Sequence, residues 1–421
     1  MVLELSTSDS CDNKVAVVCR SCGQVGLNTV LSLGNTPLAN ALLREEELSA
    51  SESKWPLELC WCPTCSLVQI SETVSPEVLF REYAYLSSFS DTMVAHARTI
   101  ADRLRETRKL GPDSLVVEVA SNDGYLLQWY HKAGVPVLGI EPARNIAQVA
   151  ESERGVRTIS EFFGRELAHQ LSRDGMRADV IHANNVLAHV ADLNGAVAGF
   201  ATLLKPEGVV VVEAPYLKDL LDHVEFDTIY HEHLCYFSLT ALTLLFGQQG
   251  LEIFDVERLK IHGGSLRIHA AKAGTTSVKA SVHDLLEEEA TWVRDPEFYQ
   301  SFGERVESLR RELVGLLNSL KAEGKRIAVY GASAKGSTLL NYFGIGSDVL
   351  EYVVDRSTVK QGRYTPGTRL KIHDPSRLTE DQPDYCLLLT WNFAEEVLAQ
   401  QEQYRSRGGK FIIPIPSVRV A

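Results

Sequence analysis

The sequence predicts an α/β protein built from a small cysteine-bound module, a central seven-stranded sheet and a second sheet at the carboxyl end. Three observations lead to this prediction. Two CxxC pairs lie within the first 65 residues. Residues 115–141 have the pattern strand, loop, helix, strand, and a similar pattern returns at residues 325–355. Each of the two patterns is typical of a Rossmann-like unit.

Length and composition are those of a globular protein with two or three domains. The chain has 421 residues, of which 45% are hydrophobic and 23% charged. We expect the cysteine-bound module and a linker over residues 1–88, the central sheet over 89–275 and the second Rossmann-like unit over 276–421. The sequence leaves the oligomeric state open, and a monomer is compatible with it.

Charge and hydropathy restrict the partners. The formal net charge of −13 argues against nucleic acid, because phosphate binding requires a basic face. The sequence does not open with a basic stretch and an apolar run, and it contains no apolar run long enough to span a bilayer. We therefore expect a cytoplasmic protein without a membrane partner.

The pairs Cys19/Cys22 and Cys62/Cys65 predict a closed four-cysteine zinc site. Each CxxC lies on a tight turn that can direct two thiolates to one metal ion. A redox function needs only one such pair near a βαβ unit, and a disulfide framework does not suit the cytosol. The long spacing between the pairs requires an inserted loop. Because four thiolates leave no open position, we expect a structural zinc ion that stabilises the module.

Residues 78–88 join this module to the central sheet and contain Tyr83 and Tyr85. From the residues alone, aromatic packing at a domain boundary is favoured over a tyrosine hydroxyl presented to a substrate. Residues 91–110 then have the apolar spacing of an amphipathic helix, which would cover the first strand of the central sheet.

The loop after the first central strand runs from Glu118 to Gly124 and has the sequence EVASNDG. A dinucleotide-binding loop has three glycines, whereas this loop has two acids and one glycine. Acids repel a pyrophosphate but suit a cationic ligand that carries an amino acid. The second strand, residues 137–140, ends at Glu141, whose carboxylate can accept hydrogen bonds from a ribose. An ordinary βαβ unit without a ligand is the less favoured alternative.

This loop resembles motif I of the S-adenosylmethionine-dependent methyltransferases. The resemblance implies that Glu118 begins the cofactor loop and that Glu141 holds the ribose. The aromatic residues Phe162 and Phe163 can flank an adenine ring, although core packing accounts for them equally well. The expected cofactor-binding residues are Glu118, Ala120, Asn122, Gly124, Tyr125, Leu126, Glu141, Phe162 and Asn184.

Seven strands are expected in the central sheet, at residues 115–119, 137–140, 156–159, 179–184, 209–213, 251–256 and 265–271. The carboxyl end of strand 179–184 should open into the ligand crevice, as in other sheets of this kind. We expect the last two strands to form a hairpin, which fits a methyltransferase sheet better than a dehydrogenase sheet.

The run Tyr230-His231-Glu232-His233 places four titratable residues in succession among aromatic residues. It is not HExxH, because its histidines are two apart rather than four apart, so a shared metal ion is disfavoured. A surface cluster is also disfavoured beside so many aromatic residues. Histidine has a suitable pKa for proton transfer near neutrality, and a neighbouring tyrosine or glutamate can orient it. The run predicts an acid–base centre that faces the sulfonium methyl group.

The two CxxC pairs, the EVASNDG loop, the YHEH run and a later GASAKG loop occur in one order. Together they resemble the deoxysugar C-3 methyltransferases that act on nucleotide-linked 4-keto sugars in antibiotic biosynthesis, over nearly the whole chain. The resemblance implies that His233 removes the C3 proton and that Tyr230 and Glu232 assist it. It also implies that the sugar pocket is lined by Tyr83, Asn185 and His189.

The carboxyl-terminal unit follows a charged helical stretch at residues 281–324. Its loop, residues 331–338, is not a P-loop, because Lys335 precedes the second glycine instead of following it. It is not a dinucleotide loop either, because Ser333 replaces the middle glycine. Small residues at a helix start, together with Lys335, can still hold a diphosphate, so we expect a nucleotide-sugar, with dTDP as the nucleotide, rather than NAD. A Rossmann-like unit without a ligand is the alternative. Residues 390–393, TWNF, can offer an aromatic face to a base. The expected substrate contacts are Gly331, Ser333, Lys335, Gly336 and Asn392.

Carbon is favoured as the methyl acceptor, because a carbon acid beside a ketone needs a base and a stabilised enolate. An O- or N-methyltransferase acting on a nucleotide-sugar or another secondary metabolite is the alternative. A nucleic-acid methyltransferase conflicts with the acidic balance of the chain. A non-catalytic zinc and Rossmann scaffold leaves the YHEH run unexplained, and a bifunctional methyltransferase–dehydrogenase conflicts with Ser333.

Overall fold

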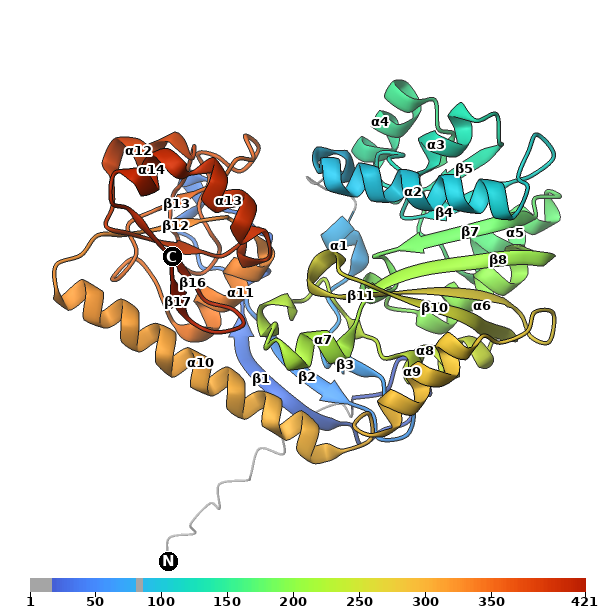
Figure 1. Cartoon of the computed structure of the whole chain (residues 1–421), viewed down its shortest axis with the longest axis horizontal. Coiled ribbons are helices and arrows are strands. Elements are labelled where there is room, and N and C mark those ends of the chain that lie inside the picture. Colours follow the sequence, from blue (N-terminus) through green and yellow to red (C-terminus); the bar gives the residue numbers. More distant parts are fainter. Residues whose placement is uncertain (1–16, 81–85) are drawn as a thin grey trace, which may run out of the picture.

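The computed structural model describes residues 17–80 and 86–421, so Cys11, Tyr83 and Tyr85 lie outside the described residues. The described chain forms two lobes (Figure 1). One lobe holds the central sheet and the other holds the carboxyl-terminal sheet. The long helix α10 (Pro296–Ala322) and the strands β1 (Asn28–Thr36) and β2 (Trp55–Trp61) extend from one lobe to the other. No helix in these ranges is long and apolar enough to cross a membrane.

The central sheet has seven strands, as expected. Strands β8, β7, β4, β5 and β6 are parallel, and β11 and β10 form an antiparallel hairpin at one edge. From that edge the order is β10 (Leu251–Leu259), β11 (Ser265–Lys272), β8 (Leu204–Pro215), β7 (Ala178–Asn184), β4 (Val116–Val119), β5 (Val137–Ile140) and β6 (Thr158–Ile159).

Helices cover both faces of this sheet because its inner strands are apolar on both sides. Val116 and Val180 pack with α2 and α3, whereas Val117 and Ile181 belong to the cluster that includes α6. The expected amphipathic helix is α2, which buries Ala97 and other small and apolar residues. The helices of this lobe are α2 (Asp91–Thr107), α3 (Leu127–Lys132), α4 (Arg144–Arg154), α5 (Arg165–Arg173), α6 (Leu193–Leu203), α7 (Leu217–Asp222) and α8 (Leu239–Gly247).

The amino-terminal module forms a four-stranded antiparallel sheet in the order β1-β2-β3-β9. Three strands lie near the cysteines in sequence, and the fourth comes from the segment that follows the YHEH run. The short helix α1 (Pro76–Phe80) follows the sheet. The strands are β1 (Asn28–Thr36), β2 (Trp55–Trp61), β3 (Val68–Ile70) and β9 (Cys235–Tyr236).

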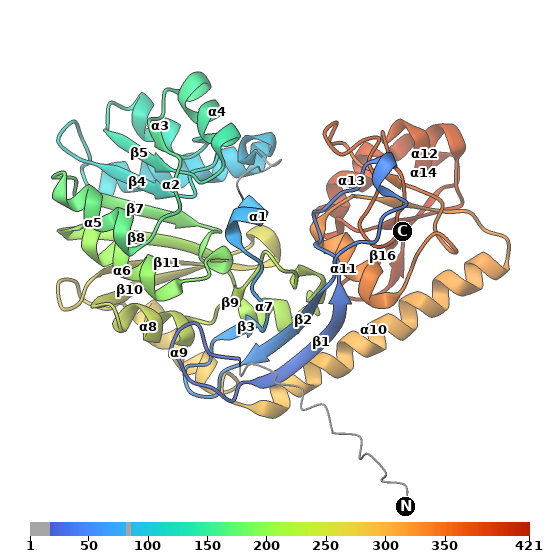
Figure 2. The same cartoon turned by 180° about the vertical axis from the view of Figure 1, so that it is seen from behind.

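The inserted loop between the two CxxC pairs reaches the second lobe, as the view from behind shows (Figure 2). Leu43 forms a β-bridge with Tyr364, and Arg369 makes an ion pair with Glu52 at 3.2 Å. The module therefore contacts both lobes.

The carboxyl-terminal sheet has six strands, of which only β17 is antiparallel to its neighbour. The predicted second Rossmann-like unit is thus present. Its order is β14 (Ile372–His373), β13 (Val353–Val354), β12 (Ile327–Tyr330), β15 (Tyr385–Leu388), β16 (Lys410–Ile413) and β17 (Arg419–Val420). Its helices are α11 (Ala334–Phe343), α12 (Ser376–Asp381), α13 (Ala394–Gln400) and α14 (Glu402–Ser406), and α9 (Ala280–Ala290) precedes α10.

Candidate active site

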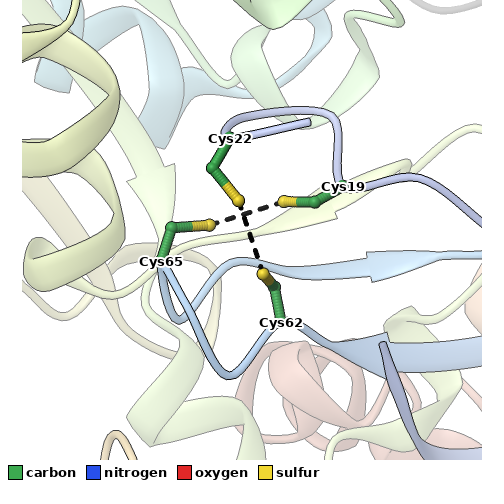
Figure 3. Close-up of side chains that lie close together, drawn as sticks. All are labelled: Cys19, Cys22, Cys62 and Cys65. Carbon is green, nitrogen blue, oxygen red and sulfur yellow. Dashed lines mark hydrogen bonds between the residues drawn. The ribbon is translucent and has the colours of Figure 1, made fainter. Parts of the chain in front are cut away.

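The four predicted cysteine ligands form one cluster (Figure 3). The sulfurs of Cys19 and Cys65 are 3.4 Å apart, those of Cys22 and Cys62 are 3.6 Å apart, and all four lie within 4.8 Å of one another. A tetrahedral zinc ion with bonds of about 2.3 Å spaces its sulfur ligands about 3.8 Å apart. The cluster therefore fits zinc, and Cys60, which is buried in β2, is outside it.

A cavity of about 790 Å³ extends from the carboxyl ends of the central strands to the second lobe. It is lined at one end by the loop after β4 and by Glu141, and at the other end by Lys335 and Asn392. Its position agrees with the rule that ligands bind beyond the carboxyl ends of parallel strands.

Three positions of the loop after β4 have left-handed backbone conformations: Ala120 (φ +53°), Asn122 (φ +48°) and Gly124 (φ +76°). Such a conformation is costly for residues with a side chain and concentrates at functional sites. Here it places the loop against the end of β5. The Glu141 carboxylate accepts hydrogen bonds from the Asn122 amide at 3.0 Å and from the Ala143 amide at 2.9 Å. Glu141 thus fixes the loop while it lines the cavity.

Six of the nine predicted cofactor contacts line this cavity: Ala120, Asn122, Tyr125, Glu141, Phe162 and Asn184. The buried amide oxygen of Asn184 has no hydrogen-bond partner among the described residues. An acceptor of this kind, beside a carboxylate at the end of β5, fits a ligand that carries hydroxyl and ammonium groups, such as S-adenosylmethionine.

Three predicted cofactor contacts lie outside the cavity wall. Leu126 is fully buried in the core. A Cβ on Gly124 would lie 3.2 Å from Val156, so this glycine permits close packing as well as the left-handed turn. Glu118 is also buried, and burial, followed by the charges of Asp123 and Glu141, raises the pKa of its carboxyl well above the ordinary value.

The YHEH run divides into two pairs. Tyr230 and His233 line the cavity. His231 points to the amino-terminal module, where its Nε2 lies 3.1 Å from the Pro56 carbonyl oxygen. The Glu232 carboxylate accepts a hydrogen bond from Asn40 at 2.7 Å and does not line the cavity. The Glu232 carboxylate therefore faces the amino-terminal module, and the assistance of Glu232 to His233 stays a prediction.

Hydrogen bonds define the neutral form of His233. Its Nδ1 lies 2.9 Å from the Thr228 carbonyl oxygen, and a carbonyl only accepts, so Nδ1 carries the proton. In the neutral ring Nε2 then holds the lone pair. The Tyr230 hydroxyl lies 2.9 Å from this Nε2 and donates to it. The nitrogen that faces Tyr230 is thus the basic one.

Asn185 and His189, also predicted, line the same cavity. Nδ1 of His189 donates to the backbone carbonyl of Glu232 at 2.7 Å. The centroids of the His189 and His233 rings are 4.8 Å apart. Burial lowers the pKa of His189. His189 is therefore neutral near pH 7 and does not oppose a positive charge on His233.

In the second lobe only Lys335 and Asn392 of the five predicted substrate contacts line the cavity. The Ser333 hydroxyl instead accepts the Gly336 amide at 3.1 Å and caps α11. A Cβ on Gly336 would lie 2.6 Å from Leu389, and one on Gly331 would lie 2.6 Å from Thr390. These glycines are needed for close packing, which a sequence pattern does not distinguish from phosphate binding.

The Trp391 ring contacts Lys335 on one face. The ammonium nitrogen of Lys335 lies 4.6 Å from the centroid of its ring, and its indole nitrogen donates to Asp227 at 2.7 Å. This hydrogen bond joins the second lobe to the segment that carries Tyr230 and His233.

Sequence reasoning missed several cavity residues, among them Glu225, Thr228 and Tyr236. Thr228 acts through its backbone carbonyl, for which no residue type is a signal. Glu225 is buried, and its pKa is raised to about 7 by desolvation, an effect that Lys335 opposes and Asp227 reinforces. An isolated glutamate in the sequence gives no indication of such an environment.

The fold and the cavity define the class of protein, and family models agree with them. Residues 93–256 match a model described as "Methyltransferase domain", and residues 19–80 match one described as "Putative zinc binding domain". Residues 260–416 match the "C-methyltransferase C-terminal domain". The protein is an S-adenosylmethionine-dependent methyltransferase with a zinc-binding module.

The chain belongs to the C-methyltransferase family that includes NovU of Streptomyces niveus. It is 38% identical to that protein over 404 residues, which are 96% of each chain. A ubiquinone biosynthesis O-methyltransferase of Bartonella tribocorum is 27% identical over 34% of this chain and 58% of its own length. Magnesium protoporphyrin IX methyltransferase from Synechocystis PCC 6803 covers 46% of this chain and 90% of its own, with 16% identity and a TM-score of 0.35. A likeness this low supports no further argument.

Proposed function

We propose that the protein transfers a methyl group to C3 of a nucleotide-linked 4-keto deoxysugar, with a dTDP sugar as the substrate. One observation carries this proposal: the Tyr230–His233 pair and Lys335 line the same cavity as the cofactor loop. The proposed base, the cation for a phosphate and the site of the methyl donor thus all face one cavity. Methylation of a deoxysugar for antibiotic biosynthesis is the proposed biological role.

His233 is the proposed base. The C–H bond beside the ketone breaks, its electron pair passes into the enolate, and the proton moves to Nε2 of His233. The resulting imidazolium keeps its hydrogen bond from Nδ1 to the Thr228 carbonyl, which stabilises the positive charge. S-adenosylmethionine, when bound, supplies the electrophilic methyl group.

Tyr230 and Asn185 have supporting roles in this proposal. The Tyr230 hydroxyl, 2.9 Å from Nε2, fixes the plane of the imidazole before the substrate arrives. The Asn185 side chain can donate to the enolate oxygen, a type of contact that stabilises charge in the transition state. His189 stays neutral and shapes the pocket. Tyr83, outside the described residues, remains a predicted pocket residue.

In this proposal the nucleotide end of the substrate lies beside Lys335 and Asn392. Lys335 is a cation at the start of α11, where its ammonium group and the helix dipole both favour a diphosphate. Asn392 offers an amide that can contact a base or a sugar.

The test uses the protein with S-adenosylmethionine labelled with ¹³C in the methyl group and a dTDP-4-keto-2,6-dideoxyhexose. Carbon NMR of the product distinguishes a methyl group on carbon from one on oxygen. The 4-ketone activates both C3 and C5, and the couplings of the labelled methyl group identify which of the two was substituted. A methyl group on C3 is the expected result. A methyl group on oxygen would contradict carbon as the acceptor, and one on C5 would correct only the position.

A further inference from the structure

We infer that Trp391 of the carboxyl-terminal unit is a positioning residue for the catalytic base, acting through Asp227 and the Thr228 carbonyl. The inference rests on the proposed role of His233. It gives the second lobe a part in the chemistry beyond nucleotide binding.

The first step is the hydrogen bond between the lobes. The indole nitrogen of Trp391 donates to Oδ2 of Asp227 at 2.7 Å. Asp227 is fully buried. A buried carboxylate is costly without donors, so this contact constrains the position of Asp227 strongly.

The second step is the short 3-10 helix η4 (Phe226–Thr228), in which Asp227 lies. Phe226 stacks on Phe343 of α11, with ring centroids 4.9 Å apart and an interplanar angle of 20°. The second lobe therefore holds η4 at two points, one polar and one aromatic.

The third step leads from η4 to the base. The carbonyl of Thr228, the residue after Asp227, accepts the Nδ1 proton of His233 at 2.9 Å, and the Tyr236 hydroxyl lies 3.4 Å from the same oxygen. This carbonyl selects the tautomer whose Nε2 is basic. Any displacement of η4 changes the orientation of His233.

Lys335 connects the same indole with the substrate site. Its ammonium group lies 4.6 Å from the centroid of the Trp391 ring, and it lines the cavity. One side chain thus contacts both the cation proposed to meet the diphosphate and the carboxylate that positions the catalytic segment.

The test compares the variants Trp391→Phe, Asp227→Ala and Asp227→Asn. For each, we measure the rate at which a dTDP-4-keto-2,6-dideoxyhexose takes up deuterium at the carbons beside its ketone, with S-adenosylhomocysteine bound to the enzyme. Phenylalanine keeps an aromatic face for Lys335 but removes the N–H donor. Asparagine keeps an oxygen that can accept from the indole. Trp129→Phe is the matched control, because Trp129 lies on α3, where Arg98 and Lys132 contact its ring.

We expect Trp391→Phe and Asp227→Ala each to slow deuterium uptake about tenfold or more, and Asp227→Asn to recover most of the rate. The double variant Trp391→Phe/Asp227→Ala should be no slower than the slower single variant, because both changes break one connection. The affinity for S-adenosylmethionine should stay within about twofold of the wild-type value.

The pH profile separates positioning from general destabilisation. If η4 shifts in Trp391→Phe, the Thr228 carbonyl stabilises the His233 imidazolium less, and the pKa of His233 falls. The acidic limb of the exchange profile should therefore move to lower pH in this variant. Within residues 17–80 and 86–421, the titratable side chains with ring contacts to His233 are His189, Tyr230 and Tyr236, and the substitution changes none of them.

Two outcomes overturn the inference in different ways. If His233→Gln abolishes exchange but Trp391→Phe and Asp227→Ala keep the wild-type rate and acidic limb, the positioning role is wrong and the proposed base stands. If His233→Gln itself exchanges at the wild-type rate, the proposed base is wrong, and the positioning role falls with it.

Discussion

Val68 of the zinc-binding module pairs with Tyr236, three residues beyond His233 in the chain. The Leu234 carbonyl also accepts a hydrogen bond from the Ile70 amide at 3.0 Å, so β3 pairs directly with the segment that carries the proposed base. On its other side this segment is held by the carboxyl-terminal unit through Asp227. The zinc-binding module and the carboxyl-terminal unit therefore both contribute to the geometry of the proposed base.

Loss of the zinc ion should disturb catalysis as well as stability. Cys62→Ser removes one ligand at the turn between β2 and β3, and we expect it to lose the single zinc ion per chain. We also expect it to lower the melting temperature by about 5 °C or more and to reduce methylation. Elemental analysis and calorimetry measure these effects.

Cys60→Ser is the matched control for the zinc prediction. Cys60 is buried like Cys62, but it lies in β2 and outside the cluster. The Cys60→Ser variant should therefore keep its zinc. A wild-type protein without zinc, or a Cys62→Ser variant with a full equivalent, would contradict the four-cysteine site.

Replacement of the proposed base should separate binding from chemistry. His233→Gln keeps a side chain of similar length but has no basic nitrogen, so we expect methylation to fall at least about 100-fold. Binding of S-adenosylmethionine, measured by titration calorimetry, should be retained. Wild-type turnover in this variant would exclude His233 as the base.

Glu141 should determine cofactor affinity. In Glu141→Gln the side chain keeps only one acceptor oxygen, so it loses either the Asn122 or the Ala143 amide contact and its charge. We expect the dissociation constant of S-adenosylmethionine to rise about tenfold. The exposed Glu153 on α4 provides the control Glu153→Gln, which should bind as the wild type does. Equal affinity in both variants would argue against a cofactor role for Glu141.

Glu225 should make stability depend on pH. Burial raises the pKa of its carboxyl from the ordinary value of 4.5 to about 7 in the folded protein. Between these two values the folded state retains a proton that the unfolded state loses, so the free energy of unfolding falls as pH rises through this window. Above about 7 both states are ionised and this contribution is constant.

Glu225→Gln should remove that part of the pH dependence, since the amide does not titrate. Denaturant unfolding of both proteins at several pH values between 4.5 and 7 measures the difference in slope. Glu207→Gln, at an exposed position in β8, is the control. Identical slopes in the wild type and Glu225→Gln would contradict the raised pKa.

The sequence predicted the parts of the site that depend on local pattern. Paired cysteines indicated the metal cluster, short apolar runs indicated the seven strands, and the acid after a buried strand indicated Glu141. The domain boundaries at residues 88 and 275 remain predictions. The pairing of β9 with β3 could not be predicted, because a two-residue strand far from its partners has no periodicity.

The sequence also could not predict in which direction the side chains of the site point. Four consecutive titratable residues do not reveal that His231 and Glu232 point to the amino-terminal module while Tyr230 and His233 line the cavity. Small residues needed for packing, such as Gly336, have the same pattern as residues that bind phosphate. The bond between Trp391 and Asp227 joins residues 164 positions apart, and only the folded chain brings them together.

Deuterium uptake at the carbons beside the ketone directly tests whether His233 generates an enolate. The protein is incubated in deuterium oxide with a dTDP-4-keto-2,6-dideoxyhexose and S-adenosylhomocysteine, and the C3 and C5 protons are followed by NMR. We expect the C3 signal to be lost in the presence of the wild-type enzyme and to be retained with His233→Gln. A methylated product formed from S-adenosylmethionine without any exchange at C3 or C5 would contradict an enolate generated by His233.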